Sequence, residues 1–359
     1  MSQTRLDTVL DTLQARGLLD AAQKRAALDH AARHEAPTTL LARAMTALSA
    51  WIAAIAFLCA IGGCAALLGV EDEAAITFIG GALLVGATVA SHVAAEGRFL
   101  RHLVLVATLA GKFSFYGGLG TLLDSEDATA LAVLLTSIAL AFTHADVFER
   151  TLAVYIGQAS LAFWFRDDLS IGVPVVTAVA LGLTFLAWQA PEPPASVQLS
   201  GLRSPLAWGG LLGLIGVRSV AELTRMDEMG RADPLAWLTP LILTAALIAA
   251  IPAVLSRLEL DERRVELGGM LVFTVLGLAW FAGSEPGVLV GLVGLVLSVD
   301  QRDRARQVVS VLALIGFGIR FYYDMDLGFL AKAGVLAGSG ALLLVLRAGV
   351  RWRFSELAS

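Results

Sequence analysis

Residues 318–340 read GIRFYYDMDLGFLAKAGVLAGSG, a polar stretch that joins two strongly apolar segments near the end of the chain. Its polar side chains are Arg320, Tyr322, Tyr323, Asp324, Asp326 and Lys332. A charged side chain within a membrane costs roughly 2.5–3.5 kcal/mol on insertion scales, so charges at that depth usually serve a purpose. We therefore expect this stretch to form a polar site at the outer face of a helical membrane bundle.

The composition of the whole chain favours a membrane protein. Of its 359 residues, 57% are hydrophobic and 16% are charged, whereas a soluble domain is about 25% charged. Apolar runs close to the ~20 residues that a spanning helix needs recur from Met45 onward. The sequence lacks the alternating pattern of β-barrel strands. These features predict an all-α, polytopic transmembrane helix bundle.

The boundaries of the expected spans follow the apolar runs, which suggest about twelve of them. They are 45–69, 74–95, 102–123, 128–144, 151–165, 171–190, 205–222, 234–255, 265–282, 286–299, 307–322 and 327–346. The bundle thus occupies residues 45–346, between an N-terminal segment (1–44) and a short tail (347–359). Segment 1–44 should form two short amphipathic helices, the first ended by Gly17 and the second capped by Asp20 and running to about His34.

The basic residues indicate the orientation of the bundle. If the N-terminus lies in the cytoplasm, 19 of the 26 Lys and Arg residues fall in inside segments, as the positive-inside rule requires. The opposite loops are acidic, for example Glu-Asp-Glu at 71–73 and Asp-Ser-Glu-Asp at 124–127. The sequence therefore predicts a multi-pass protein with both termini, including the N-terminal helical pair and the tail, in the cytoplasm.

Similar segments recur along the chain and suggest internal repeats. LAFWF at 161–165 resembles LAWFA at 278–282, and each precedes a span that contains or begins near a proline. We interpret the bundle as three parallel four-helix repeats, related by an axis along the membrane normal, over residues 45–144, 151–255 and 265–346. Chance similarity between helices rich in Leu, Gly and Ala is the alternative.

A basic residue stands late in the third helix of each repeat, namely Lys112, Arg218 and Arg320. Lys112 is expected in mid-membrane, too far from either surface to snorkel at a rise of ~1.5 Å per residue. Tyr116 follows it one turn outward on the same face. A pore or ligand role and a structural ion pair are both open for Lys112. Arg218 can pair with Glu222 along one helix, and that interfacial pair is the alternative to a binding role.

The expected outer-face site combines these residues with the opening stretch. Arg320 and Lys332 can bind an anionic group together, or the two nearby aspartates can neutralise them within the chain. The adjacent tyrosines are alternatively residues of the aromatic belt at the membrane interface. The predicted ligand-binding or partner-binding residues are Lys112, Tyr116, Arg218, Arg320, Tyr322, Tyr323, Asp324, Asp326 and Lys332.

Motifs of known enzyme chemistries are missing from the sequence. It has no HExxH, GxSxG or CxxC pattern and no Walker lysine motif. Glycines four residues apart, such as Gly287 and Gly291, indicate close helix packing. His92, His102 and His144 each stand near a helix end, and we interpret them as interface residues rather than metal ligands. We therefore expect no catalytic residue, metal or cofactor, and topology explains the basic loops without a nucleic-acid partner.

The C-terminal tract FYYDMDLGFLAKAGVLAGSGALLLVLR (321–347) resembles the end of an uncharacterised family of bacterial multi-pass membrane proteins, described only as domains of unknown function. The residues that match its tyrosine run, acidic turn, lysine and Gly-rich span are Tyr322, Tyr323, Asp326, Leu330, Lys332 and Gly340. Ala333 departs from the small hydroxyl residue expected there. The resemblance implies an inner-membrane location and a small membrane-anchored, periplasmic partner protein with a GDY motif. It implies no activity and no catalytic residues.

These observations favour a binding protein over an enzyme. The leading hypothesis is a non-enzymatic inner-membrane protein whose outer polar cluster binds an acidic partner segment or an anionic ligand. The alternative is a secondary carrier for a small anion, coupled to protons through Lys112. An enzyme acting on lipid-linked substrates comes third, with Asp324 and Asp326 as its candidate carboxylates.

Overall fold

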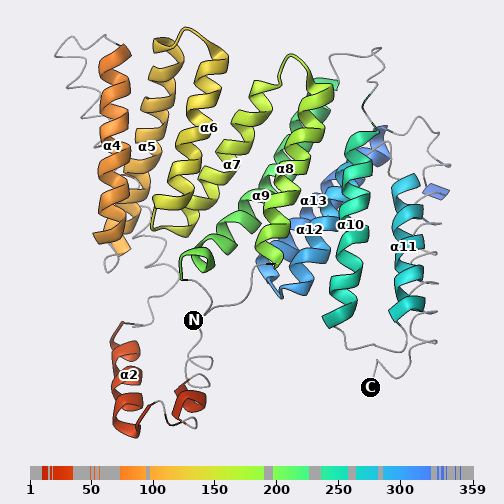
Figure 1. Cartoon of the computed structure of the whole chain (residues 1–359), viewed down its shortest axis with the longest axis horizontal. Coiled ribbons are helices and arrows are strands. Elements are labelled where there is room, and N and C mark those ends of the chain that lie inside the picture. Colours follow the sequence, from red (N-terminus) through yellow and green to blue (C-terminus); the bar gives the residue numbers. More distant parts are fainter. Residues whose placement is uncertain are drawn as a thin grey trace. The chain divides into compact units, whose positions relative to one another are not determined.

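A computed structural model of the chain contains helices and turns, and no strand, over the residues that it describes. Those residues are 10–14, 17, 19–34, 49, 52, 56, 73–93, 98–189, 197–225, 235, 237–257, 264–281, 286–324, 330, 333–334, 337, 344 and 348. The helices are α2 (Ala21–His34), α4 (Glu73–Val93), α5 (Arg98–Leu122), α6 (Glu126–Thr143), α7 (Val147–Trp164), α8 (Leu169–Gln189), α9 (Val197–Arg225), α10 (Leu238–Arg257), α11 (Arg264–Phe281), α12 (Pro286–Asp300) and α13 (Arg304–Asp324) (Figure 1).

Each of the helices α4 to α13 covers one of the predicted apolar segments. Among the described residues, six helices are long and apolar enough to cross a membrane, namely α4, α5, α6, α8, α10 and α13. Helices α11 and α12 are apolar but shorter. The predicted spans 45–69 and 327–346 lie almost wholly outside the described residues. The count of twelve spans and the three repeats therefore stay predictions.

The distribution of side chains is the one expected when lipid replaces water around the protein. Large apolar side chains are exposed on several helices, for example Phe113 on α5 and Trp280 on α11, which is 92% exposed. Polar side chains such as Thr108 and Ser310 are fully buried. Soluble proteins show the opposite tendency, so this inverted pattern and the six long apolar helices together indicate a helical membrane protein.

The predicted N-terminal helical pair is partly described, and its capping residues act as expected. Gly17 has a φ of +70° and follows the short helical segment 10–14. Asp20 Oδ1 accepts a hydrogen bond from the backbone N–H of Gln23 at 2.6 Å, and Gln23 Oε1 accepts one from the Asp20 N–H at 3.0 Å. This reciprocal arrangement is a capping box, and it starts α2 where the sequence predicted.

The chain divides into two compact units, residues 1–118 and 119–359. In the first unit, α4 and α5 pack closely because glycines remove side chains from their contact. A Cβ atom on Gly118 would lie 2.1 Å from Thr77 Oγ1, and one on Gly80 would lie 2.4 Å from the Phe115 backbone nitrogen. Gly118 and Gly80 thus let α4 and α5 approach each other closely.

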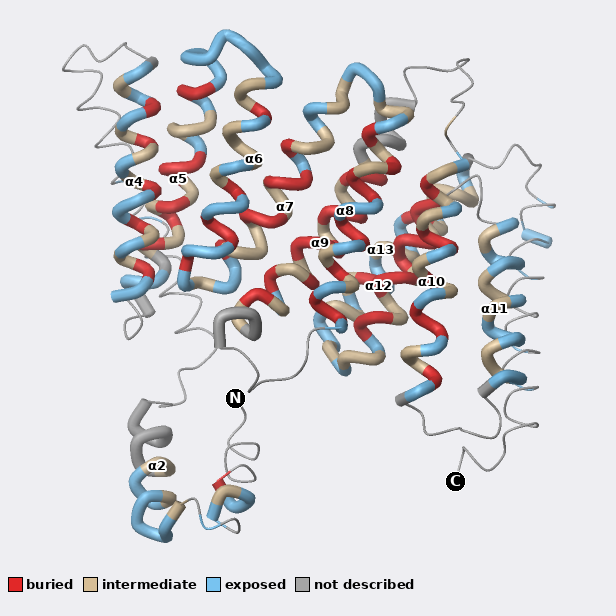
Figure 2. Tube along the Cα trace, in the orientation of Figure 1, coloured by how far each residue is buried: buried red, intermediate tan, exposed pale blue. Residues whose placement is uncertain are grey.

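Helix α9 packs against α7, α8 and α12 of the second unit. Figure 2 shows many buried residues on α8, α9 and α12, whereas α11, which packs against α10, shows none. Glycines bring α9 close to its neighbours. A Cβ on Gly210 would lie 2.2 Å from Thr184 Oγ1 of α8, and one on Gly209 would lie 2.5 Å from Val154 Cγ1 of α7.

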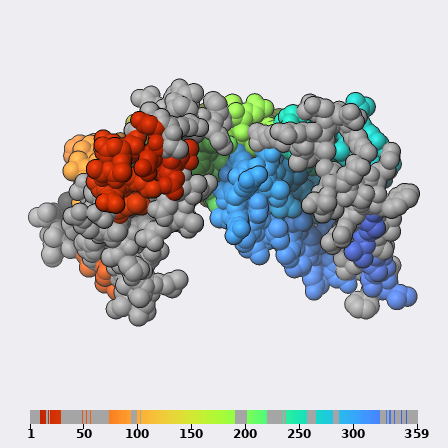
Figure 3. Space-filling view, turned by 90° about the horizontal axis from the view of Figure 1, so that it is seen from below, coloured from red at the N-terminus to blue at the C-terminus, as the bar shows by residue number. Residues whose placement is uncertain are grey.

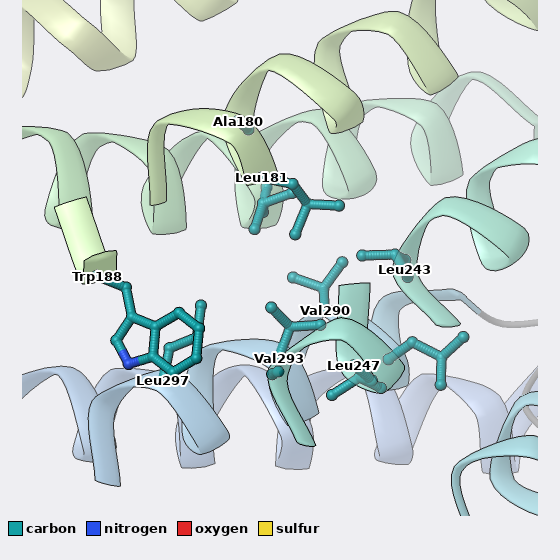
Figure 4. Packing of buried hydrophobic residues seen from close by; sticks show 11 residues of the cluster. Ala180, Leu181, Trp188, Leu243, Leu247, Val290, Val293 and Leu297 are labelled. Atoms are coloured by element: carbon teal, nitrogen blue, oxygen red, sulfur yellow. The ribbon is translucent and has the colours of Figure 1, made fainter. Parts of the chain in front are cut away.

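The apolar core of the second unit joins α8, α9, α10 and α12 (Figure 4). Its buried residues are Ala180, Leu181, Trp188, Leu214, Leu243, Leu247, Ala250, Leu289, Val290, Val293 and Leu297. At one end of this core, Trp188 Nε1 donates a hydrogen bond to Asp300 Oδ2 at 2.6 Å. That bond ties the last turn of α8 to the last turn of α12.

Helices α12 and α13 form a closely packed hairpin. A Cβ on Gly287 would lie 2.4 Å from the Phe317 ring, and one on Gly291 would lie 3.0 Å from Leu314 Cα. The prediction that these two glycines serve helix packing is therefore confirmed. The remaining surface of α13 is largely exposed, and the blue atoms in Figure 3 show one side of this region.

Candidate functional site

The predicted polar cluster lies at the end of α13, and the structure describes part of it. The rings of Tyr322 and Tyr323 meet edge to face, with centroids 5.6 Å apart. Tyr323 is exposed, whereas Arg320 and Tyr322 are half-buried. The side chain of Asp324 lies outside the described residues, as do Asp326 and Lys332. The structure thus places one cation and two tyrosines together, and the acidic turn stays a prediction.

The other predicted site residues lie inside the protein. Lys112 of α5 is 3% exposed and Arg218 of α9 is 2% exposed, so both face protein rather than lipid, as the cost of charge in hydrocarbon requires. Tyr116 is half-buried, with its ring centroid 6.0 Å from that of Phe115. Lys112 and Tyr116 belong to the first unit and Arg218 to the second. The Glu222 side chain, the predicted partner of Arg218, is outside the described residues.

Within the part of the chain that the structure describes, no three His, Cys, Asp or Glu side chains converge as metal ligands. His144 is fully buried at the turn between α6 and α7, and its Nδ1 accepts a hydrogen bond from the Asp146 N–H at 3.1 Å. Arg150 Nε donates to the His144 carbonyl oxygen. These two hydrogen bonds stabilise the turn between α6 and α7, so the observed role of His144 is structural.

A cavity of about 320 Å³ lies between α7, α8 and α9 of the second unit, and we call it the α7–α9 cavity. Most of its wall is apolar. It is lined by Tyr155, Gln158, Ala159, Ala162, Phe163, Arg166, Leu169, Gly172, Val173, Gly213, Gly216 and Val217. This volume lies at the small end of the range of ligand-binding pockets, and a mostly apolar wall with a few polar groups is typical of them.

Gln158 is the buried polar residue of the α7–α9 cavity, with 3% exposure. Its Nε2 donates to the Gly209 carbonyl oxygen of α9 at 3.0 Å and to the Val154 carbonyl oxygen, one turn earlier in α7, at 3.3 Å. Its Oε1 is buried and accepts no hydrogen bond from any described group. Buried polar atoms are usually paired, so this oxygen is an exception within the contact between α7 and α9, where it lies against Gly213.

Arg166 lines the α7–α9 cavity from the turn between α7 and α8, and its side chain is 29% exposed. Its guanidinium binds Glu126 Oε2 at 2.7 Å and Asp127 Oδ1 at 3.0 Å, and lies 4.0 Å from Asp167 Oδ2. It also lies over the Phe163 ring, 4.7 Å from the centroid, which is a cation–π contact. The hydrogen bond to Asp127 raises the pKa of the Arg166 guanidinium.

A family model for a domain of unknown function, DUF4401, matches residues 39–353. The chain belongs to the DUF4401 family. The resemblance drawn from the C-terminal tract is thereby confirmed as membership of an uncharacterised family. No curated protein and no solved structure matches this DUF4401 protein. The matched region includes α4 to α13, and thus the whole α7–α9 cavity.

The sequence of this DUF4401 protein did not lead us to predict the cavity, because we chose the candidate residues mainly by their charge. Placing an amide such as Gln158 in a membrane costs less free energy than placing Arg or Lys there, so this criterion did not select Gln158. The available signal was its setting: Gln158 stands between the small residues Gly157 and Ala159 in the middle of a predicted span. Small residues beside a polar residue are typical of contact faces between membrane helices.

Proposed function

We propose that this DUF4401 protein is a non-enzymatic, multi-pass membrane protein that binds a small, largely apolar ligand in the α7–α9 cavity. The observation that carries the proposal is the cavity itself, which has a volume of about 320 Å³, a mostly apolar wall and a few polar lining residues. A preformed apolar cavity with a few polar groups is the usual form of a small-molecule site.

The residues of the cavity wall favour binding over catalysis. Acid–base and nucleophilic catalysis use groups such as His, Asp, Glu, Cys, Ser, Lys or Tyr placed against the substrate. Of these types, the lining residues of the α7–α9 cavity, all described, include only Tyr155. Their polar members are Tyr155, Gln158 and Arg166. A wall of this kind can hold and select a molecule, and it offers little to activate one.

A photo-crosslinking experiment with a matched pair of valines tests the proposal. Val173 lines the α7–α9 cavity, whereas Val179, on the same helix, is exposed and does not line it. The probe is a medium-chain alkyl methyl ether that carries a diazirine, added to membranes containing the full chain. We expect labelling of peptides from α7, α8 and α9. Val173→Phe should abolish most of it, because the larger ring fills the cavity, and Val179→Phe should leave it unchanged.

Labelling that is confined to exposed surfaces, or that Val173→Phe and Val179→Phe reduce equally, would contradict a ligand site in the cavity. Size-exclusion chromatography in detergent checks that both variants remain folded and monodisperse. An excess of unlabelled ether should compete with specific labelling in the cavity, and it should leave non-specific labelling of the lipid-facing surface in place.

The topology is part of the same proposal. The distribution of basic residues supports a bacterial inner-membrane protein with its N-terminus and C-terminus in the cytoplasm. Ala145 precedes α7 and Asp167 follows it, and both are exposed. In a background without Cys59 and Cys64, Ala145→Cys and Asp167→Cys should react with an impermeant maleimide from opposite sides, with position 167 accessible from the periplasm. Labelling of both from one side would exclude this topology.

A second candidate function concerns the end of α13. Arg320 and the edge-to-face pair Tyr322 and Tyr323 favour it, because they gather one cation and two hydroxyls within one helix end. With Asp324, Asp326 and Lys332, they would bind an anionic ligand or an acidic segment of a small membrane-anchored partner. Co-purification from native membranes tests this site. If Arg320→Ala and Lys332→Ala leave every co-purifying molecule in place, it does not exist.

A secondary carrier is the remaining alternative, and the burial of Lys112 is the observation that favours it. Ionisable groups inside membrane helices commonly serve ion or proton pathways. Proteoliposomes with the purified protein should then accumulate a small anion in a manner that depends on a proton gradient and on Lys112. Absence of flux across a broad panel of anions would count against a carrier and leave the binding proposal untouched.

A further inference from the structure

We infer that the α7–α9 cavity holds one acyl chain of a bilayer phospholipid whose headgroup carries an ammonium group. The chain enters sideways from the membrane, and the headgroup stays outside the cavity, beside Arg166. This inference rests on the proposed function and adds the class of the ligand. Three features carry it: the exposed rim of the cavity, its depth along α7, and the charges around Arg166.

The cavity opens on the flank of α7. Among its lining residues, Ala159 and Phe163 of α7 are exposed, whereas Gly172, Gly213 and Val217 are buried and form the floor. Ala159 lies about 8 Å before the end of α7, at a rise of ~1.5 Å per residue. The opening is therefore beside the helix and not at its tip. The exposed flank of a membrane helix contacts lipid, so the hydrocarbon chains of the bilayer have direct access to the cavity.

The depth of the cavity matches one leaflet of a membrane. Its lining residues on α7 run from Phe163 near the helix end to Tyr155, which lies about 14 Å before that end at a rise of ~1.5 Å per residue. On α8 they lie within the first turns, from Leu169 to Val173. One leaflet supplies about 15 Å of the ~30 Å hydrocarbon core. An extended chain that starts at the turn between α7 and α8, at the upper end of these helices in Figure 1, can thus follow the cavity to its deepest point.

The charges around Arg166 favour a headgroup with an ammonium group. Arg166 is the charged residue of the cavity lining, and three carboxylates, those of Glu126, Asp127 and Asp167, lie within 4.0 Å of its guanidinium. All three carboxylates are more exposed than Arg166. This cluster attracts an ammonium group and repels a purely anionic headgroup, because its sum is negative. A zwitterionic headgroup offers one charge of each sign to a cluster that holds both.

Two photoactivatable phospholipids test the inference in nanodiscs that contain the full chain. Both carry the same acyl chain with a diazirine, but one has a phosphoethanolamine headgroup and the other a phosphoglycerol headgroup. We expect both to label α7, α8 and α9, the phosphoethanolamine lipid roughly two- to fivefold more strongly, which is the range set by exposed ion pairs. High salt should reduce this preference, because it screens exposed charges.

The position of the diazirine along the chain tests the direction of entry, and it needs no variant. A diazirine near the carboxyl end of the acyl chain should label residues around Phe163 and Leu169. A diazirine near the methyl end should label residues around Tyr155 and Gly213. The same labelled residues for both positions, or the reverse order, would overturn the arrangement of the chain along α7.

A matched pair of alanines tests the opening. Ala159→Phe narrows it and should abolish most of the phospholipid labelling in the cavity. Ala178→Phe is the control, because Ala178 of α8 is also exposed but does not line the cavity, and it should leave the labelling unchanged. A double variant, Glu126→Gln with Asp127→Asn, leaves one carboxylate beside Arg166 and should remove the preference for phosphoethanolamine.

The outcomes separate the two proposals. If the methyl ether labels the cavity and the phospholipids label only the exposed surface, the inference is wrong and the proposed function stands. Equal labelling of the cavity by both headgroups would overturn the ammonium assignment, and equal labelling of Ala159→Phe and Ala178→Phe would overturn sideways entry. If neither the ether nor the phospholipids label the cavity, the proposed function itself fails.

Discussion

The substitution Gly213→Ala tests the geometry of the α7–α9 cavity directly. The new Cβ would lie 1.7 Å from Gln158 Oε1, 2.4 Å from Cδ and 2.9 Å from Nε2. Contacts this short are impossible, so the amide must rotate away or the helices must separate. Rotation breaks the bond from Gln158 Nε2 to the Gly209 carbonyl oxygen at 3.0 Å. The substitution should therefore destabilise the contact between α7 and α9.

The magnitude follows from three terms. Leaving buried polar groups of Gln158 and Gly209 without partners costs about 1–3 kcal/mol. Overpacking adds about 1–3 kcal/mol. The higher helix propensity of Ala returns at most about 1 kcal/mol. We therefore expect a net loss of about 1–5 kcal/mol in the free energy of unfolding.

Equilibrium unfolding in mixed micelles titrated with SDS, followed by tryptophan fluorescence, measures this loss. Gly182→Ala is the matched control: Gly182 lies within α8, and nothing lies within 4 Å of its Cβ position. That substitution should be neutral or stabilising by at most about 1 kcal/mol. Of the two variants, only Gly213→Ala should thus lower the stability. Equal stability of Gly213→Ala and the unmodified chain would show that Gln158 does not occupy the position described.

Three further predictions use the same unfolding assay. Trp188→Phe removes the hydrogen bond to Asp300 Oδ2 and should cost about 1–3 kcal/mol; an unchanged stability would show that this bond is not formed. Leu289→Ala empties a fully buried core position and should cost about 2–5 kcal/mol, and a loss well below 1 kcal/mol would contradict the packing. Burial raises the pKa of the Asp303 carboxyl, but hydrogen bonds from Arg306 outweigh it and hold that pKa below its ordinary value. A lowered pKa of Asp303 stabilises the fold above the unfolded pKa of about 4, and this stabilisation is lost as the pH falls through the folded value. Asp303→Asn should therefore reduce the acid sensitivity of unfolding. Equal acid sensitivity of this variant and the unmodified chain would refute the role of Arg306.

The positions of the helices could be predicted from the sequence because their signals are local. Pro286 was expected to open a span, and α12 begins there, since proline suits the first position of a helix. The burial of Lys112 was likewise predictable from its distance to either surface. The cavity was not predictable, because the bond from Gln158 to Gly209 joins residues 51 positions apart. The cavity depends on how α7 packs against α9, and the composition of the chain does not determine that packing.

The polarity of α7 links its place in the fold to its proposed role. By composition, α7 is not among the described helices that are apolar enough to cross a membrane. Glu149 and Gln158 are among the polar residues that lower its hydropathy. Lipid requires an apolar surface only where it touches a helix, and α7 packs against α6, α8 and α9. Protein neighbours thus allow α7 to carry polar groups. The enclosure that admits Gln158 to the interior also lets its amide join α7 to α9 through the Gly209 carbonyl oxygen.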